Sequence, residues 1–171
     1  APTLRLERDD VAAQGRHLLI QYEAGRRKEA LAGLRARGIR VLEAVPRNAV
    51  SAWVPAGADP LAAPGVRWAG PLAPTDKVSL RAEHRARNLS VLVDVFPDVR
   101  RSAARAAIGR VGGREIPNSY LRATTLHVEI DASALGSLAA QDEVSFIYAA
   151  SAAIEQNQPV VMCMGALAQG A

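Results

Sequence analysis

Alternating apolar and polar residues predict a first group of strands and helices in the N-terminal half of the chain. Residues 17–23 alternate, which places Leu18 and Ile20 on one face of a predicted strand. Residues 26–37 carry apolar side chains at helical spacing, and Gly38 follows as a helix-ending residue. Further predicted elements are strands at 39–45, 49–55 and 66–68 and a short helix at 59–63. The predicted order is strand, helix, strand, strand, helix, strand.

The same order of elements recurs in the second half, with matching landmarks roughly 75 residues further along the chain. The predicted strands are 89–96, 114–116, 122–130 and 144–148, and the predicted helices are 97–111 and 132–140. Asp59, Asp98 and Asp131 each lie at the start of a predicted helix and are expected to cap its N-terminus. Residues 46–48 and 117–119 carry the Pro and Asn expected of turns between strands.

This repeated order predicts the α+β class, with two tandem ferredoxin-like βαββαβ units and an extended C-terminal tail. In each unit the helices cover one face of an antiparallel sheet, and the other face is left to meet a partner. Alternatively, the two units cover each other's sheets. The predicted segments are an N-terminal lead-in (1–15), a first unit (16–72), a linker (73–87), a second unit (88–150) and the tail (151–171).

Composition narrows the classes of partner. Hydrophobic residues make up 49% of the chain, enough to form buried cores, so wholesale disorder is not expected. The net charge of +4 is spread among interleaved acidic residues, which argues against a nucleic-acid partner. Apolar runs stay short of a membrane span, so no membrane association is expected. The single cysteine, Cys163, excludes an internal disulfide and is expected to be a buried apolar side chain.

Motifs for catalysis or metal binding are absent from the sequence. The histidines His17, His84 and His127 are scattered and lack the spacing of a metal site. The glycines of 109–113 follow a predicted helix instead of opening one, so they are expected to end it and not to bind phosphate. The sequence has no Gly-x-Ser-x-Gly nucleophile motif. We therefore expect a non-catalytic binding protein without cofactor or metal.

Two other binding functions remain open from the residues alone. One is a tandem ferredoxin-like module for a small molecule or another protein. The other, with weaker support, is RNA binding, because RNA-recognition modules share the βαββαβ order and stack bases on strand aromatics. Those aromatics are sparse here, and no Lys/Arg-Gly-Phe/Tyr signature is present. Four arginines that would attract phosphates are expected to form a solvated helix face: Arg100, Arg101, Arg105 and Arg110.

Several stretches resemble the propeptide of a secreted bacterial subtilisin-like serine peptidase. They are the opening strand HLLIQYE with the helix after it, VLEAVPRNAV at 41–50, GPLAPTDKVS at 70–79 and LAAQDEVSFI at 138–147. The resemblance implies a secreted or periplasmic prosegment that assists folding of the peptidase catalytic domain and then inhibits it. It also implies ferredoxin-like units, although the usual propeptide has one such unit and this chain has two predicted.

The resemblance further implies two contact regions with the peptidase. The tail would lie in the substrate cleft like a cleaved product, through Ala168, Gln169, Gly170 and Ala171. The outer sheet face and nearby acidic residues would dock on surface helices of the peptidase, through Leu92, Phe96, His127, Glu129, Asp142 and Glu143. Both chain ends fit this interpretation, because Ala1 would follow a removed targeting segment and Ala171 would precede the cut bond.

Overall fold

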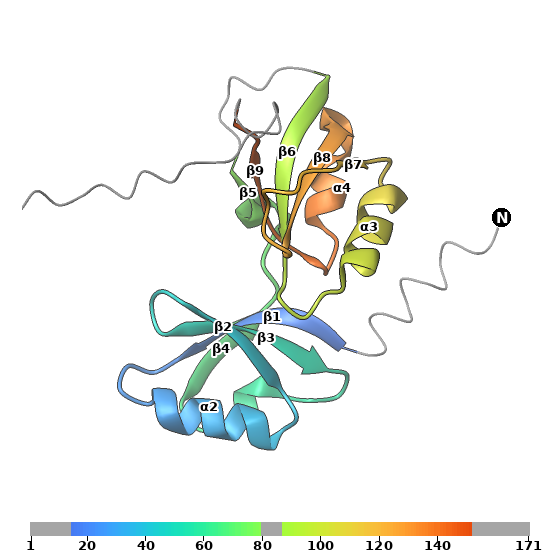
Figure 1. The fold of residues 1–171 in the computed structure, drawn as a ribbon. Coiled ribbons are helices and arrows are strands. Elements are labelled where there is room, and N and C mark those ends of the chain that lie inside the picture. The colour runs from blue at the N-terminus through green and yellow to red at the C-terminus, as the bar shows by residue number, and fades with distance from the viewer. Residues whose placement is uncertain (1–14, 80–86, 152–171) are drawn as a thin grey trace, which may run out of the picture.

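The computed structural model describes residues 15–79 and 87–151, which form an α+β protein with two β-sheets (Figure 1). The predicted α+β class is therefore confirmed. We call residues 15–70 the first unit and residues 74–79 with 87–151 the second unit. The predicted lead-in and tail lie outside the described residues, apart from one residue at the inner end of each.

The first unit is an antiparallel four-stranded sheet in the order β2-β3-β1-β4. Helix α2 covers one face of this sheet, and the second unit stands on the other (Figure 1). Its elements are β1 (Gly15–Tyr22), α2 (Arg27–Ala36), β2 (Arg40–Val45), β3 (Ala49–Pro55), the 3-10 helix η1 (Pro60–Ala62) and β4 (Val66–Gly70).

The predicted alternation of β1 sets which side chains enter the core of the first unit. Leu18 and Ile20 are buried against α2, where Ala30 and Leu34 face the sheet. Gly38 has φ 74° and follows the helix, as predicted, because a residue without Cβ adopts this left-handed conformation readily. The side chain of Asp59 accepts a hydrogen bond from the Leu61 amide, so this predicted cap is confirmed.

The second unit is a five-stranded sheet in the order β5-β9-β6-β8-β7. Helices α3 and α4 pack on one face through Ala104, Ile108 and Leu138, and strands β6 and β8 supply most of the remaining core (Figure 1). Its elements are the 3-10 helix η2 (Pro74–Lys77), β5 (Val78–Ser79), β6 (Asn88–Val95), α3 (Arg101–Arg110), β7 (Arg114–Ile116), β8 (Thr125–Asp131), the 3-10 helix η3 (Ala132–Ala134), α4 (Leu135–Ala139) and β9 (Val144–Ala149).

Residues 73–87 are predicted to be a linker, but η2 and β5 within this segment belong to the second unit. Strand β5 pairs in parallel with β9 through Val78 and Ser79, so the second sheet is mixed and not purely antiparallel as expected. Helix η2 packs on α4, and its Lys77 is buried. The contacts of this segment are the β5 pairing, the packing of Val78 on the second core and the hydrogen bond of Lys77 to the Gln141 carbonyl oxygen, none of which its polar, proline-rich composition indicates.

The second helix of each unit differs in length between the two units. The second helix of the first unit is only the short 3-10 helix η1, because Pro60 opens it and the chain leaves helical geometry at Ala63. In the second unit Asp131 caps η3 through the Ser133 amide, as predicted, and α4 follows directly. No helix in the described ranges is long and apolar enough to cross a membrane.

Candidate functional site

A buried histidine lies where the two units meet. Leu18, Ile20 and Tyr22 face the core of the first unit. Because side chains alternate along a strand, His17 points from the opposite face of β1, toward the second unit. Its imidazole stacks on the Phe96 ring with centroids 4.1 Å apart and planes within 4°. The ring of Trp53, which pairs with His17 from β3, lies 5.3 Å from the His17 ring, measured between centroids. Only 7% of His17 is exposed, although the sequence places it on an outward strand face.

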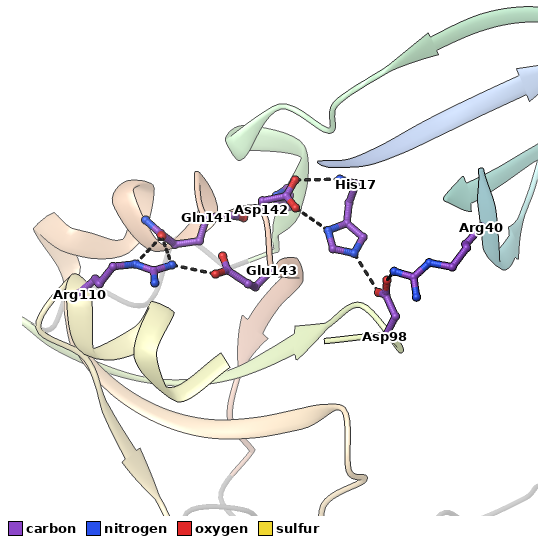
Figure 2. Close-up of polar contacts among 8 residues, drawn as sticks. His17, Arg40, Asp98, Arg110, Gln141, Asp142 and Glu143 are labelled. Carbon is purple, nitrogen blue, oxygen red and sulfur yellow. Dashed lines mark hydrogen bonds and ion pairs between the residues drawn. The ribbon is translucent and has the colours of Figure 1, made fainter. Parts of the chain in front are cut away.

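Two carboxylates of the second unit hold this imidazole from both sides (Figure 2). Nδ1 lies 2.6 Å from Asp142 Oδ2, and Nε2 lies 2.9 Å from Asp98 Oδ1. The His17 backbone amide also donates to Asp142 Oδ1 over 2.9 Å. Since a carboxylate accepts and does not donate when ionised, both contacts are fully satisfied only by the doubly protonated imidazolium. We call His17, Asp98 and Asp142 the His17 clamp.

The clamp favours the charged form of the histidine. Burial of the imidazole works against its charge, but the hydrogen bonds and charges of Asp142, followed by those of Asp98, outweigh burial and raise the pKa of His17 above its ordinary value. With both ring nitrogens held by carboxylates, the imidazole has no free position to accept a proton from a hydroxyl group. In this arrangement His17 joins the units and does not serve as a general base.

Asp98 does not cap helix α3 as the sequence predicts. Helix α3 begins at Arg101, and its N-cap residue Arg100 makes no side-chain cap hydrogen bond. The Asp98 carboxylate instead binds His17 Nε2 through Oδ1. Through Oδ2 it accepts a hydrogen bond from Arg40 Nη2 of β2 at 3.0 Å (Figure 2). Charged donors from another unit compete successfully with the local cap because they form ion pairs as well as hydrogen bonds.

A cavity of about 500 Å³ lies beside the clamp, between the outer face of the first sheet and the second unit. Its walls are mostly apolar, with a few polar and charged side chains. The lining residues are His17, Leu18, Leu19, Glu43, Val45, Ser51, Pro71, Leu72, Ala73, Pro74, Lys77, Phe96, Ala139, Ala140, Asp142 and Ser145. Apolar walls with a few polar groups are typical of small-ligand sites. Residues 15–79 and 87–151 contain no cluster of three or more His, Cys, Asp or Glu side chains that could hold a metal ion.

The six residues predicted to dock on a peptidase do not form one exposed face. Leu92 and His127 lie on the outer face of the second sheet but are buried, and His127 Nε2 lies 2.8 Å from Ser90 Oγ. Glu129, on the same face, forms an ion pair with Arg114 and keeps 40% of its side chain exposed. Phe96 follows the end of β6, where strand alternation no longer applies, and it turns onto His17.

The two remaining acidic residues of that set already have partners within the chain. Asp142 belongs to the His17 clamp, and Glu143 accepts from Arg110 Nη2 at 2.8 Å, which also donates to Gln141 (Figure 2). Arg101 and Arg105 pair with Glu115 of β7. The expected solvated arginine face is confirmed, because Arg100, Arg105 and Arg110 are exposed and Arg101 is half-buried. Three of these arginines also pair with acidic side chains of the second unit.

The exposed aromatic residues of β9, the His17 clamp and the buried Lys77 are not among the functional candidates predicted from the sequence. Phe146 of β9 is 38% exposed on the outer face of the second sheet, and its ring lies 6.2 Å from that of Tyr148. The alternation of 144–148 places both side chains opposite the buried Ile147 and could have identified them. The clamp and buried Lys77 carry no such signal. The predicted cleft residues Ala168 to Ala171, and Cys163, lie outside the described residues.

Comparison with known proteins gives a partial family match and one similar solved structure. A family described as "Domain of unknown function (DUF8729)" matches residues 2–73, less than half of the chain. Among solved structures the chain is similar to the acetolactate synthase small subunit from Thermotoga maritima, at 13% identity and a TM-score of 0.25. That alignment covers 78% of this chain and 90% of the other, and its TM-score is too low to carry an argument. No curated protein matches the chain.

Proposed function

We propose that the chain is a non-catalytic prosegment of a secreted subtilisin-like serine peptidase, built from tandem ferredoxin-like units. The proposal rests on the strand order and helix placement of the second unit. Strand order β9-β6-β8-β7, with α3 and α4 on one face, matches the order expected of a ferredoxin-like domain and so supports the proposal. Within residues 74–79 and 87–151 no helix lies on the other face. The first unit has the equivalent order β4-β1-β3-β2, with η1 in place of the second helix.

The outer face of the second sheet suits a protein partner. Phe146 and Tyr148 offer partly exposed aromatic surface there, and aromatic side chains are enriched at protein interfaces. Glu129 lies on the same face and is the candidate acidic group for a helix N-terminus of the peptidase. Glu129 pairs with Arg114 but keeps 40% of its side chain exposed. Asp142 and Glu143 are withdrawn from this role because their carboxylates bind His17 and Arg110 and keep only 28% and 14% of their side chains exposed.

The C-terminal tail is the second proposed contact. Residues 168–171 are small or polar, which suits a subtilisin-type cleft, and an extended segment can pair with a strand edge beside such a cleft. A sheet surface and a tail on one chain then bind as two linked contacts, so the tail contact benefits from the effective concentration that the docked sheet creates.

Inhibition of a secreted bacterial subtilisin tests both contacts. The full chain is expected to inhibit tightly, and a chain that ends at residue 164 is expected to lose about tenfold or more in affinity because the cleft contact is gone. Potency that is unchanged by this truncation would rule out the tail-in-cleft mechanism.

The sheet contact is tested in the same assay with a matched pair of variants. Phe146→Asp places a charge on the proposed docking face and is expected to weaken inhibition by about tenfold. Leu61→Asp makes the same change at a side chain that is 55% exposed on η1 of the first unit, and it should leave inhibition unchanged. Equal effects of the two substitutions would reject the outer face of the second sheet as the docking surface.

A further inference from the structure

The cavity between the units has the size and walls of a small-ligand site. It measures about 500 Å³, within the usual range for such sites. Apolar surface comes from Leu19 and Val45 of the first unit. On the other side it comes from Leu72, after the first unit, and from Phe96 of the second unit. The His17 clamp closes one part of the boundary and holds the two sides together. An apolar molecule would therefore find walls on two separate elements of the fold.

Ser51 points to a ligand with a polar group. It lies on the outer face of β3, opposite Leu19 and Glu43 on the neighbouring strands, and it lines the cavity. Only 6% of the residue is exposed, and its hydroxyl has no hydrogen-bond partner among residues 15–79 and 87–151. A buried hydroxyl without a partner is destabilising, so native proteins seldom keep one without a reason.

Lys77 points to a negative charge on that ligand. It also lines the cavity, is 6% exposed, and donates from Nζ to the Gln141 carbonyl oxygen at 3.1 Å. An ammonium group has three donors, so this one contact leaves two available. Lys77 forms no ion pair within the described part of the chain. Burial lowers the pKa of its amine, an effect that the charges of Asp142 and Glu143 partly oppose.

The surrounding charges favour a ligand with one negative charge and not two. Among the described residues that line the cavity, His17 is already matched by Asp142 and Asp98, whereas Lys77 forms no ion pair. Glu43 also lines the cavity and is exposed, and its charge would repel a second anionic group.

We propose that this cavity binds a small apolar molecule that carries a single carboxylate. Lys77 Nζ binds the carboxylate, Ser51 Oγ hydrogen-bonds to a polar atom of the molecule, and its apolar body packs among Leu19, Val45, Leu72 and Phe96. The site is separate from the outer face of the second sheet and from the tail, so it stands or falls independently of the peptidase proposal.

Calorimetric titration of the full chain with octanoate tests the site, with 1-octanol as the uncharged probe of similar length. Octanoate is expected to bind and to raise the unfolding temperature, and octanol is expected to bind about tenfold more weakly or not at all. Lys77→Gln should reduce octanoate affinity by about tenfold, whereas Lys28→Gln, at an exposed lysine of α2, should not change it.

The outcomes separate this proposal from its alternatives even if Lys77→Gln folds poorly. Ser51→Ala removes an unpartnered hydroxyl, so it should keep the unfolding temperature of the ligand-free protein while weakening octanoate several-fold. No octanoate binding at millimolar concentration, or equal binding of octanoate and octanol, would overturn the proposal. So would equal affinities in Lys77→Gln and Lys28→Gln. A folded Lys77→Gln chain that still inhibits the peptidase would show that the two sites are independent.

Discussion

At the scale of single residues, the decisive feature is the charge state of His17. Its two ring nitrogens face Asp142 and Asp98, so the junction between the units is held most strongly when the imidazole is protonated. The sequence predicts that His17 points outward from β1, and this is correct. It does not predict the two aspartates, because they lie 81 and 125 residues away in the chain and nothing local marks them as partners.

The clamp makes stability depend on pH in a defined direction. Because the pKa of His17 is raised in the folded state, its contribution is fully present below its ordinary pKa near 6.5 and is lost as the pH rises through the raised value. His17→Gln should therefore lower the free energy of unfolding by about 1–3 kcal/mol at about pH 6, and by less at about pH 9.

Urea unfolding of wild type and variant at both pH values measures this effect. The comparison uses the difference between the two proteins because buried Lys77, whose pKa is lowered, changes stability with pH in the opposite sense. Asp142→Asn should show the same pH dependence as His17→Gln, and Asp76→Asn, at an exposed carboxylate of η2, should match wild type. An equal loss for His17→Gln at both pH values would contradict a protonated clamp.

At the scale of elements, most of the secondary structure could be predicted because it depends on local pattern. Strands β1 and β8 alternate, β3 is a short apolar run, and the cap residues Asp59 and Asp131 act as predicted. The cap predicted at Asp98 was wrong because ion pairs from the first unit take its carboxylate. Strand β5 was missed because two residues are too few to show alternation.

Close packing of α2 gives a test at this scale. A Cβ atom built at Gly33 would lie 2.7 Å from Pro64 Cδ and 3.1 Å from Ala63 Cβ, so Gly33→Ala would push the helix away from the segment after η1. We expect a net loss of about 1–3 kcal/mol in the free energy of unfolding, as for other overpacked sites.

Gly109 provides the matched control for that substitution. It lies in α3, and a Cβ there would meet nothing within 4 Å. Gly109→Ala should therefore raise the free energy of unfolding by about 0.5–1 kcal/mol, through helix propensity alone. Denaturant titration measures both variants. A Gly33→Ala chain as stable as Gly109→Ala would mean that α2 does not pack as closely as described.

At the scale of the whole molecule, the arrangement of the units was the least predictable feature. The sequence leaves open whether each unit covers the other's sheet. In the structure the outer face of the first sheet meets the loops around Phe96 and Asp142 at one end of the second unit (Figure 1). This contact removes Phe96 and Asp142 from the predicted docking surface, and it creates the cavity beside the clamp. Long-range contacts of this kind depend on side chains that no local pattern brings together.

The central claim, that this chain is a peptidase prosegment, is tested most directly by the coding sequence that follows codon 171 in the source genome. The account predicts an open reading frame that continues into a catalytic domain with the Asp, His and Ser motifs of a subtilisin-like peptidase. A stop codon there, or a continuation into a domain without those motifs, would contradict it.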